Sequence, residues 1–272
     1  MVEVEPARVD GIAYREAVPA GHSDLVPALC VHGFPETSFM WRHVIAALAE
    51  SGRRAVAPDL PGFGDSPPDP PGTWERQVEA LERFRSTLGV DRCVPVVHDW
   101  GGLIALAWAC DHPDAVRALA ISSTGFFADG KWHGMATAMR EPGTGEQLVG
   151  GLERDGFAAM LGQLSSGIDH AAVGEYWKAY TDDARRQSQL DFYRSMDFEK
   201  LAPYEGRLAA LGVPVLLLWG GQDPFAPLAA AHRFERELPD TELVVFDDAG
   251  HFVWEDEPER SAAGLTAFLA RL

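Results

Sequence analysis

The segment that most limits the possible folds of this sequence is a short one in the first half of the chain, residues 93–110. A β-branched run over residues 94–97 is followed by His98 and Asp99, then by two glycines and an apolar stretch that ends at residue 110. This pattern predicts a buried strand that turns sharply into a buried helix. Because Gly101 and Gly102 have no Cβ, the helix can start almost against the strand, which puts Asp99 at the apex of the turn.

Two interpretations of Asp99 follow from this placement. Aspartate is a favoured N-cap residue, so Asp99 could simply cap the helix. The same geometry is that of a nucleophile elbow, which exposes the residue at its apex to substrate. The N–H groups of Trp100 and Gly101 would lie at a helix N-terminus, where negative charge is favoured, and would keep Asp99 ionised. A nucleophile also needs a base, an orienting acid and an oxyanion hole elsewhere in the chain.

The rest of the chain alternates between strand and helix patterns on both sides of a long central segment. Strands are expected at residues 9–15, 28–31, 54–57, 94–97, 116–122, 213–219 and 242–246, with amphipathic helices between most of them. Such alternation predicts an α/β fold with a mostly parallel central sheet flanked by helices.

The central segment has a different texture. Residues 124–201 carry no strand pattern, are broken by glycines, and contain helical patterns rich in aromatic residues. The segment is too long for a plain loop. We therefore expect residues 1–124 and 202–272 to form one core domain and residues 125–201 to form a helical cap, or lid, over the active-site edge of the sheet.

Charge and cysteine content exclude several classes of partner. The 272-residue chain has a net charge of 23 − 41 = −18, which argues against nucleic acid and anionic membrane as partners. The cysteines Cys30, Cys93 and Cys110 lie in apolar runs without metal-ligand spacing, so we expect reduced, buried thiols, no metal site and no cofactor. No stretch reaches eighteen apolar residues and residues 1–10 lack an apolar signal region, so a cytoplasmic protein is expected.

Three residues with catalytic potential each follow a predicted strand. Asp99, Asp223 and His251 appear in the order nucleophile, acid, histidine, which is a chain order used by hydrolytic triads. Taken alone, His251 could be a packed loop histidine and Asp223 a helix cap. Together with the turn at Asp99 they indicate a catalytic triad, and the loop after the second predicted strand leaves the Phe34 amide free to donate a hydrogen bond.

Short motifs around these residues resemble a known group of enzymes. The motifs are HGFPE at residues 32–36, HDWGG at residues 98–102 and AGHF at residues 249–252. They are similar to those of the α/β hydrolases with an aspartate nucleophile, the epoxide hydrolases and haloalkane dehalogenases. The resemblance covers residues 25–124 and 203–272, and it implies the α/β-hydrolase fold.

The resemblance also implies a two-step reaction on a small-molecule substrate. Asp99 would attack carbon to give an alkyl ester, and water activated by His251 would then hydrolyse that ester. Asp223 would orient His251 and stabilise its positive charge. Backbone N–H groups of Phe34 and Trp100 would form the oxyanion hole.

The leaving group decides between the two enzyme classes. In this family cap tyrosines donate a proton or a hydrogen bond to the epoxide oxygen, and Tyr193 matches the segment that carries one of them. A halide is met by N–H donors, for which Trp100 is suited, with Trp132 and Trp177 as possible second donors. His32, in the first motif, is a further candidate for substrate contact.

Neither enzyme class completes its set of residues. No match is found for a second cap tyrosine, and Phe34 stands where many dehalogenases carry a halide-binding asparagine. Epoxide opening is favoured, haloalkane dehalogenation is the alternative, and a non-catalytic ligand-binding protein of the same fold is a third reading. The identity and stereochemistry of the substrate and the oligomeric state are left open.

Overall fold

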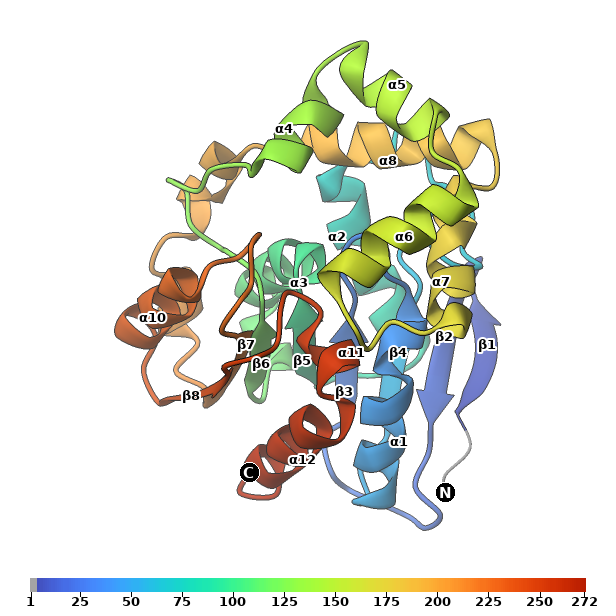
Figure 1. The fold of residues 1–272 in the computed structure, drawn as a ribbon. Helices are drawn as coiled ribbons and strands as arrows, with labels where there is room; N and C mark the ends of the chain where they lie inside the picture. The colour runs from blue at the N-terminus through green and yellow to red at the C-terminus, as the bar shows by residue number, and fades with distance from the viewer. Residues whose placement is uncertain (1–3) are drawn as a thin grey trace.

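The computed structural model describes residues 4–272, and its centre is an eight-stranded sheet (Figure 1). The strands are β1 (Glu5–Val9), β2 (Ile12–Ala17), β3 (Ala28–Val31), β4 (Ala55–Pro58), β5 (Val94–His98), β6 (Leu119–Ser122), β7 (Val215–Gly220) and β8 (Thr241–Phe246). Their order across the sheet is β1-β2-β4-β3-β5-β6-β7-β8. β2 is antiparallel to β1 and β4, and the other neighbours are parallel. The predicted mostly parallel α/β sheet is confirmed.

The first predicted strand is wrong in one respect. Residues 9–15 were expected to form a single strand, but the chain reverses at Asp10 and Gly11, which both have positive φ angles. The result is a hairpin in which Val9 pairs with Ile12. An Asp-Gly pair between two extended runs is a strong hairpin signal, because both residues tolerate the backbone of a tight turn. The strand expected at residues 116–122 is also shorter, and begins at Leu119.

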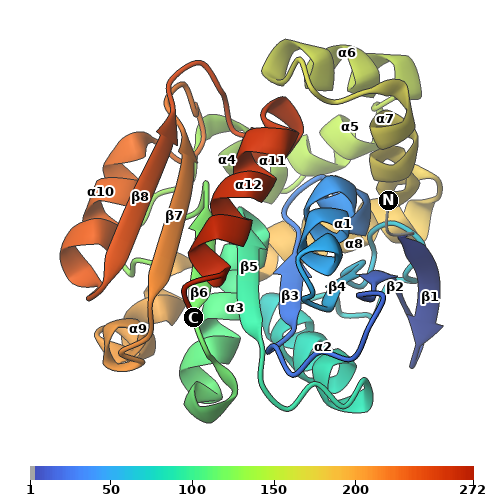
Figure 2. The ribbon, with the colours of Figure 1, turned by 90° about the horizontal axis from the view of Figure 1, so that it is seen from below.

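Helices cover both faces of the sheet (Figure 2). The α-helices of the core are α1 (Arg42–Glu50), α2 (Trp74–Thr87), α3 (Trp100–Asp111), α9 (Arg207–Ala210), α10 (Leu228–Glu237), α11 (Val253–Asp256) and α12 (Pro258–Leu269). Short 3-10 turns are η1 (Ser38–Trp41), η2 (Pro113–Ala115) and η4 (Phe198–Tyr204). α1 packs against α12 on one face and α2 against α3 on the other, while α10 packs on β7 and β8. α3 is buried over almost its whole length because both the sheet and the other helices cover it.

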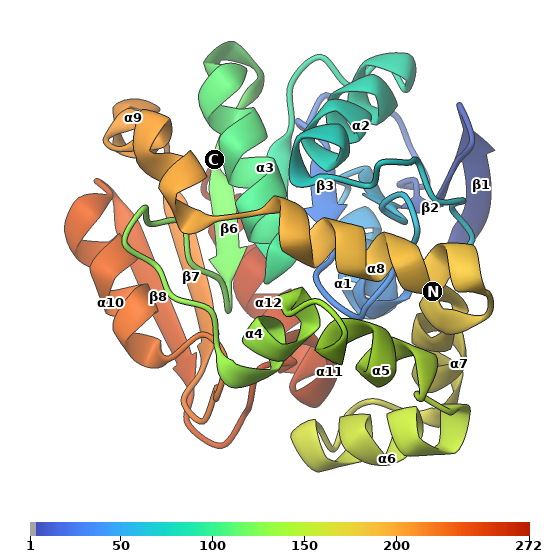
Figure 3. The same cartoon turned by 90° about the horizontal axis from the view of Figure 1, so that it is seen from above.

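The central segment is helical and contains no strand. It consists of α4 (Gly134–Arg140), α5 (Thr144–Gly150), α6 (Arg154–Leu164), α7 (His170–Trp177), η3 (Lys178–Tyr180) and α8 (Asp183–Ser195). Side chains of His133, Asp169 and Asp182 accept hydrogen bonds from the first turns of α4, α7 and α8, which explains where those helices begin. Seen from above, these helices lie across the sheet domain (Figure 3).

The three cysteines are buried and free, as predicted. Burial raises the pKa of the Cys93 and Cys110 thiols to about 12, so neither is ionised at neutral pH. Within residues 4–272, no helix combines the length and the apolar character needed to cross a lipid bilayer.

Candidate active site

The turn between β5 and α3 places Asp99 in an unusual backbone conformation. Its φ and ψ angles are 48° and −121°, and its side chain makes no capping hydrogen bond to the helix. The N-cap interpretation of Asp99 is therefore wrong. A Cβ on Gly101 would lie 2.2 Å from the Val31 carbonyl oxygen, and one on Gly102 would lie 2.4 Å from the Thr124 hydroxyl. Only glycine permits this close approach, and the strained turn projects the carboxylate away from the sheet.

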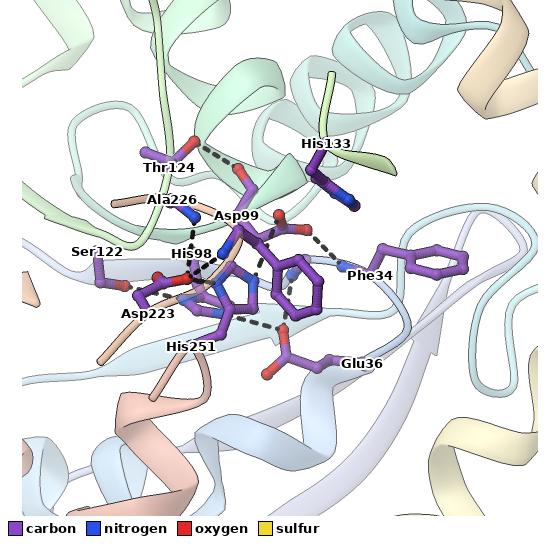
Figure 4. Close-up of polar contacts among 12 residues, drawn as sticks. Phe34, Glu36, His98, Asp99, Ser122, Thr124, His133, Asp223, Ala226 and His251 are labelled. Carbon is purple, nitrogen blue, oxygen red and sulfur yellow. Dashed lines mark hydrogen bonds and ion pairs between the residues drawn. The ribbon is translucent and has the colours of Figure 1, made fainter. Parts of the chain in front are cut away.

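The structure brings the three candidate triad residues together (Figure 4). His251 Nδ1 lies 3.0 and 2.9 Å from the two carboxylate oxygens of Asp223, and His251 Nε2 lies 3.5 Å from Asp99 Oδ2. The Asp223 and His251 side chains are almost fully buried, whereas 22% of the Asp99 side chain is exposed. The backbone N–H groups of Phe225 and Ala226 donate to Asp223 Oδ1 and fix its orientation. Asp99 is thus the member of this group that a substrate can reach.

The charges of this group support one another. Burial disfavours the charged form of His251, but Asp223 and Asp99 outweigh burial and raise its pKa well above the usual value. Burial likewise opposes ionisation of both carboxyl groups, but His251 outweighs it and lowers the pKa of Asp99 and of Asp223. The group therefore rests as an imidazolium between two carboxylates.

A backbone donor faces the second oxygen of the Asp99 carboxylate. The Phe34 N–H donates to Asp99 Oδ1 over 2.9 Å. A Cβ on the preceding residue, Gly33, would lie 2.6 Å from the same oxygen, so only glycine lets the loop pass this close. Trp100 begins α3, and its N–H is one of the helix-start donors that lack an intrahelical acceptor. The Phe34 N–H thus contacts the Asp99 carboxylate directly, and the predicted role of both amides as an oxyanion hole stays a prediction.

Two further titratable side chains are buried beside His251. His98 Nε2 lies 3.4 Å from Glu36 Oε2, and the His98 ring lies 4.8 Å from the His251 ring. Burial lowers the pKa of His98 to about 3 and raises that of Glu36 well above its usual value. His98 is therefore neutral at pH 7, and burial disfavours the charged form of Glu36.

Two of the candidate leaving-group residues lie beside Asp99. Tyr193 is buried and shares a cavity with Asp99 and His251, and its ring contacts Trp100 edge-on at 5.0 Å. Burial and the charge of Asp99 raise the pKa of the Tyr193 phenol well above its usual value, so it stays protonated. Trp132 stacks on Trp100 at 5.3 Å and lines a second cavity that also reaches Asp99.

Two other candidates lie elsewhere, and these expectations are corrected. His32 is fully buried, receives the Leu60 N–H on Nε2, and binds the Gly33 carbonyl through Nδ1, so both ring nitrogens hold loops in place. Trp177 packs among other rings of the central helices, 5.6 Å from Phe157 and 5.7 Å from Tyr180. Neither lines a cavity at Asp99. An aromatic-rich segment needs its own core, and sequence spacing does not separate core rings from cavity rings.

His133 is a further residue of this site, and no sequence motif marks it. This residue precedes α4, and its ring lies near the Asp99 carboxylate (Figure 4). It lines both cavities that reach Asp99, and burial lowers its pKa, so the ring is neutral at pH 7. Because the Ala136 N–H donates to His133 Nδ1, the remaining proton belongs on Nε2. Histidine is uncommon as an N-cap, and that position before a helix was the one available signal.

No group of three or more His, Cys, Asp or Glu side chains within residues 4–272 is arranged to hold a metal ion. The polar groups at the site are the carboxylate of Asp99 and the side chains of His251, Tyr193 and His133. This set can attack an electrophilic carbon, stabilise an oxyanion and protonate a leaving group.

Comparison with known proteins shows the family to which this chain is related. A family model described as alpha/beta hydrolase fold matches residues 27–258. A cis-3-alkyl-4-alkyloxetan-2-one decarboxylase from Xanthomonas campestris pv. campestris is 29% identical over 98% of this chain and 96% of its own. Haloalkane dehalogenase 2 from Mycobacterium bovis is 32% identical over 88% of this chain and 86% of its own. The crystal structure of epoxide hydrolase VrEH1 from Vigna radiata is 25% identical, covers 100% of this chain and 98% of its own, and has a TM-score of 0.79.

Proposed function

The chain belongs to the α/β-hydrolase fold family and is a hydrolase, and from this premise we propose that it opens apolar epoxides through an alkyl ester on Asp99. The observation that carries the proposal is the pair of neutral proton donors, His133 and Tyr193, in a cavity that also contains Asp99 and His251. An epoxide oxygen needs a proton or a strong hydrogen bond as the ring opens, whereas a departing halide needs no proton.

In the first step, Asp99 attacks a ring carbon. The Phe34 N–H holds Oδ1, so Oδ2 is the oxygen that forms the new C–O bond. The C–O bond of the ring breaks, and its electron pair becomes an alkoxide on the far side of the carbon. Tyr193 gives its proton to that oxygen, and the Nε2–H of His133 donates a second hydrogen bond.

The second step uses the change of charge that the first step creates. Esterified Asp99 carries no negative charge, so one of the two groups that raise the pKa of His251 is lost. His251 then releases a proton, which restores the Tyr193 phenol through solvent, and its neutral Nε2 can accept a proton from water. The resulting hydroxide attacks the carboxyl carbon, and the N–H groups of Phe34 and Trp100 stabilise the oxyanion. The ester C–O bond then breaks, and the departing oxygen takes the proton of the new Asp99 carboxyl group, which leaves the diol, the Asp99 carboxylate and the His251 imidazolium.

We also propose that residues 125–201 act as the cap of this site. Asp99 and His251 come from the sheet domain, whereas His133 and Tyr193 come from the central segment. The nucleophile and the proton donors therefore belong to different parts of the chain. A substrate must lie between them, as an in-line displacement requires.

Haloalkane dehalogenation is the second candidate, and one observation favours it. The indole Nε1 of Trp132 is buried without a hydrogen-bond partner, and its ring stacks on Trp100. Two indole N–H groups beside Asp99 would suit a halide ion. The 32% identity to haloalkane dehalogenase 2 also fits this candidate.

A three-substrate panel separates the candidates. The purified protein is given styrene oxide, 1-bromohexane and a cis-3,4-dialkyloxetan-2-one, and diol, bromide and carbon dioxide are measured. We expect diol formation to have the largest kcat/KM, and the Asp99→Asn variant to form none. Bromide release without diol formation would replace the proposal by haloalkane dehalogenation, and carbon dioxide release alone would indicate decarboxylation. No product from any of the three substrates would favour a non-catalytic, ligand-binding protein.

A further inference from the structure

Two cavities meet at Asp99, and their sizes differ by an order of magnitude. One measures about 20 Å³ and is lined by Asp99, His251 and Tyr193 together with side chains of α6. The other measures about 260 Å³ and extends from Asp99 along Trp100 and Trp132. We call the first the small compartment and the second the large compartment.

A pair of rings separates the compartments. His133, from the start of α4, and Phe225, from the loop after β7, line both of them. Their ring centroids lie 4.8 Å apart, and the Phe225 ring also meets the His251 ring edge-on at 5.2 Å. Asp99 is thus reached from two sides, with this ring pair between them.

The small compartment can hold little besides water. Roughly 10–15 Å³ of such space accommodates one water molecule, so about 20 Å³ has room for one oxygen-sized group, either the epoxide oxygen that Tyr193 protonates or the hydrolytic water, and not for a carbon substituent beside it. It touches both Asp99 and His251, the two residues between which a hydrolytic water must sit. Its outer wall is formed by the α6 side chains Met160, Leu161 and Leu164.

The large compartment is built for an apolar group. Most of its lining is apolar or aromatic, including Leu103, Trp132, Phe198, Phe225, Pro227 and Ala230. The hydroxyl of Thr124, which also lines it, is already bound to the Asp99 carbonyl oxygen. Trp132 Nε1 and the Ser123 hydroxyl, in the same lining, are buried without a hydrogen-bond partner, so the compartment is mainly but not wholly apolar.

Resting on the proposed function, we infer that the substrate is a terminal epoxide with one extended apolar substituent, which occupies the large compartment. A trans-disubstituted epoxide would have to place its second substituent in the small compartment, where the water belongs. Met160 and its α6 neighbours therefore select against substitution at both ring carbons, and Ala230 limits the size of the substituent at one of them.

Steady-state kinetics on matched epoxides test the inference. trans-1-Phenylpropylene oxide differs from styrene oxide by one methyl group, and an extra methylene in a closed pocket costs about 10–200-fold in kcat/KM. We expect wild-type protein to prefer styrene oxide by about 100-fold, and Met160→Ala to narrow this ratio by about tenfold because it opens the small compartment. Equal wild-type rates on the two epoxides, or an unchanged ratio in Met160→Ala, would overturn the inference.

A second pair of variants tests the large compartment. Ala230→Phe fills it, whereas Ala229→Phe puts the same ring on an exposed neighbouring position of α10. We expect Ala230→Phe to lower kcat/KM for styrene oxide by about tenfold or more, and Ala229→Phe to leave it near the wild-type value. Identical behaviour of the two variants would contradict the assignment.

Ligand binding separates failure of this inference from failure of the proposed function. Phenylacetamide is neither an epoxide nor a haloalkane, and it should quench the fluorescence of the tryptophans in the large compartment. Quenching that is lost in Ala230→Phe and kept in Ala229→Phe supports the compartment even if no epoxide is hydrolysed. Quenching that is equal in the two variants counts against it, whatever the enzyme turns over.

Discussion

Replacing Tyr193 by phenylalanine tests the proton donor for ring opening while changing little else. The substitution removes one oxygen atom and keeps the ring, which packs 4.8 Å from Phe34 and 5.0 Å from Trp100. Tyr193 is buried in the shared cavity, and the substitution would remove one side-chain hydrogen bond, that between its hydroxyl and Trp100. The fold should therefore survive, and a loss of activity would report on the hydroxyl group.

The size of the loss follows from the donors at the site. A hydrogen bond to a charged group contributes about 1.5–3 kcal/mol, and each 1.36 kcal/mol is tenfold in rate, so losing one donor to the alkoxide costs roughly 10–150-fold. Loss of a general acid costs about 10²–10⁴-fold. Because His133 still donates to the oxygen in the variant, we expect the lower end of that range, about 10²-fold.

The assay is the single-turnover rate of Asp99 alkylation by styrene oxide, compared with that by 1-bromohexane. Tyr180→Phe is the matched control, since Tyr180 is also a buried tyrosine of the central helices but does not line either cavity at Asp99. The Tyr193 variant should be slow with the epoxide and nearly normal with the bromoalkane. A Tyr193 variant that opens epoxides at the wild-type rate, or that loses both substrates equally, would refute the assigned role.

Three further outcomes are expected. Gly33→Ala should lower kcat/KM by about 10²-fold or more, because the new Cβ would lie 2.4 Å from Asp99 Cβ and displace the Asp99 side chain. Gly156→Ala, whose Cβ would have no atom within 4 Å, should leave kcat/KM unchanged. Steady-state kinetics on both variants test this. The melting temperature of wild-type protein should exceed that of His251→Gln most at low pH. The pKa of His251 is raised in the folded protein, so its protonation stabilises the fold. This stabilisation is complete below the unfolded pKa of about 6.5 and is lost as the pH rises through the folded pKa. Glu255→Ala should lower the free energy of unfolding by about 3 kcal/mol in urea titrations. The buried Glu255 carboxylate accepts hydrogen bonds from Arg42 Nη1 at 2.8 Å and Nη2 at 2.9 Å, and without it the Arg42 charge has lost this partner. Glu259→Ala, at an exposed position, is the control and should change the free energy of unfolding little.

Much of the fold could be predicted because each buried strand has a recognisable local sequence pattern. Buried parallel strands read as short apolar runs, and the residues that follow them gather at one edge of the sheet whatever the loops do. This is why Asp99, Asp223 and His251 could be selected from positions far apart in the chain. The N-terminal hairpin was missed because the extended patterns before and after Asp10 and Gly11 were read as one strand.

The central helical segment is harder to interpret because its aromatic residues have two kinds of surroundings. Tyr193 shares a cavity with Asp99 whereas Trp177 packs among other rings of the segment, and both have the same kind of neighbours in the sequence. His133 could not be selected as a site residue because it lies outside any motif, and the residues next to it in the sequence do not indicate whether its side chain faces a cavity, the core or solvent. Which rings reach Asp99 is fixed by how the central helices pack against the sheet and its loops, and that packing depends on residues far apart in the sequence.

The ester on Asp99 is the central claim, and mass spectrometry of the His251→Gln variant tests it most directly. Without the base, the second step should slow by about 10²–10⁴-fold while alkylation continues, so the ester should accumulate. After a brief incubation with styrene oxide, the account predicts a gain of one substrate mass, located by digestion on the peptide that contains Asp99 and absent from the Asp99→Asn, His251→Gln double variant. Diol formation by the single variant with no adduct at any time, or an adduct on a residue other than Asp99, would contradict it.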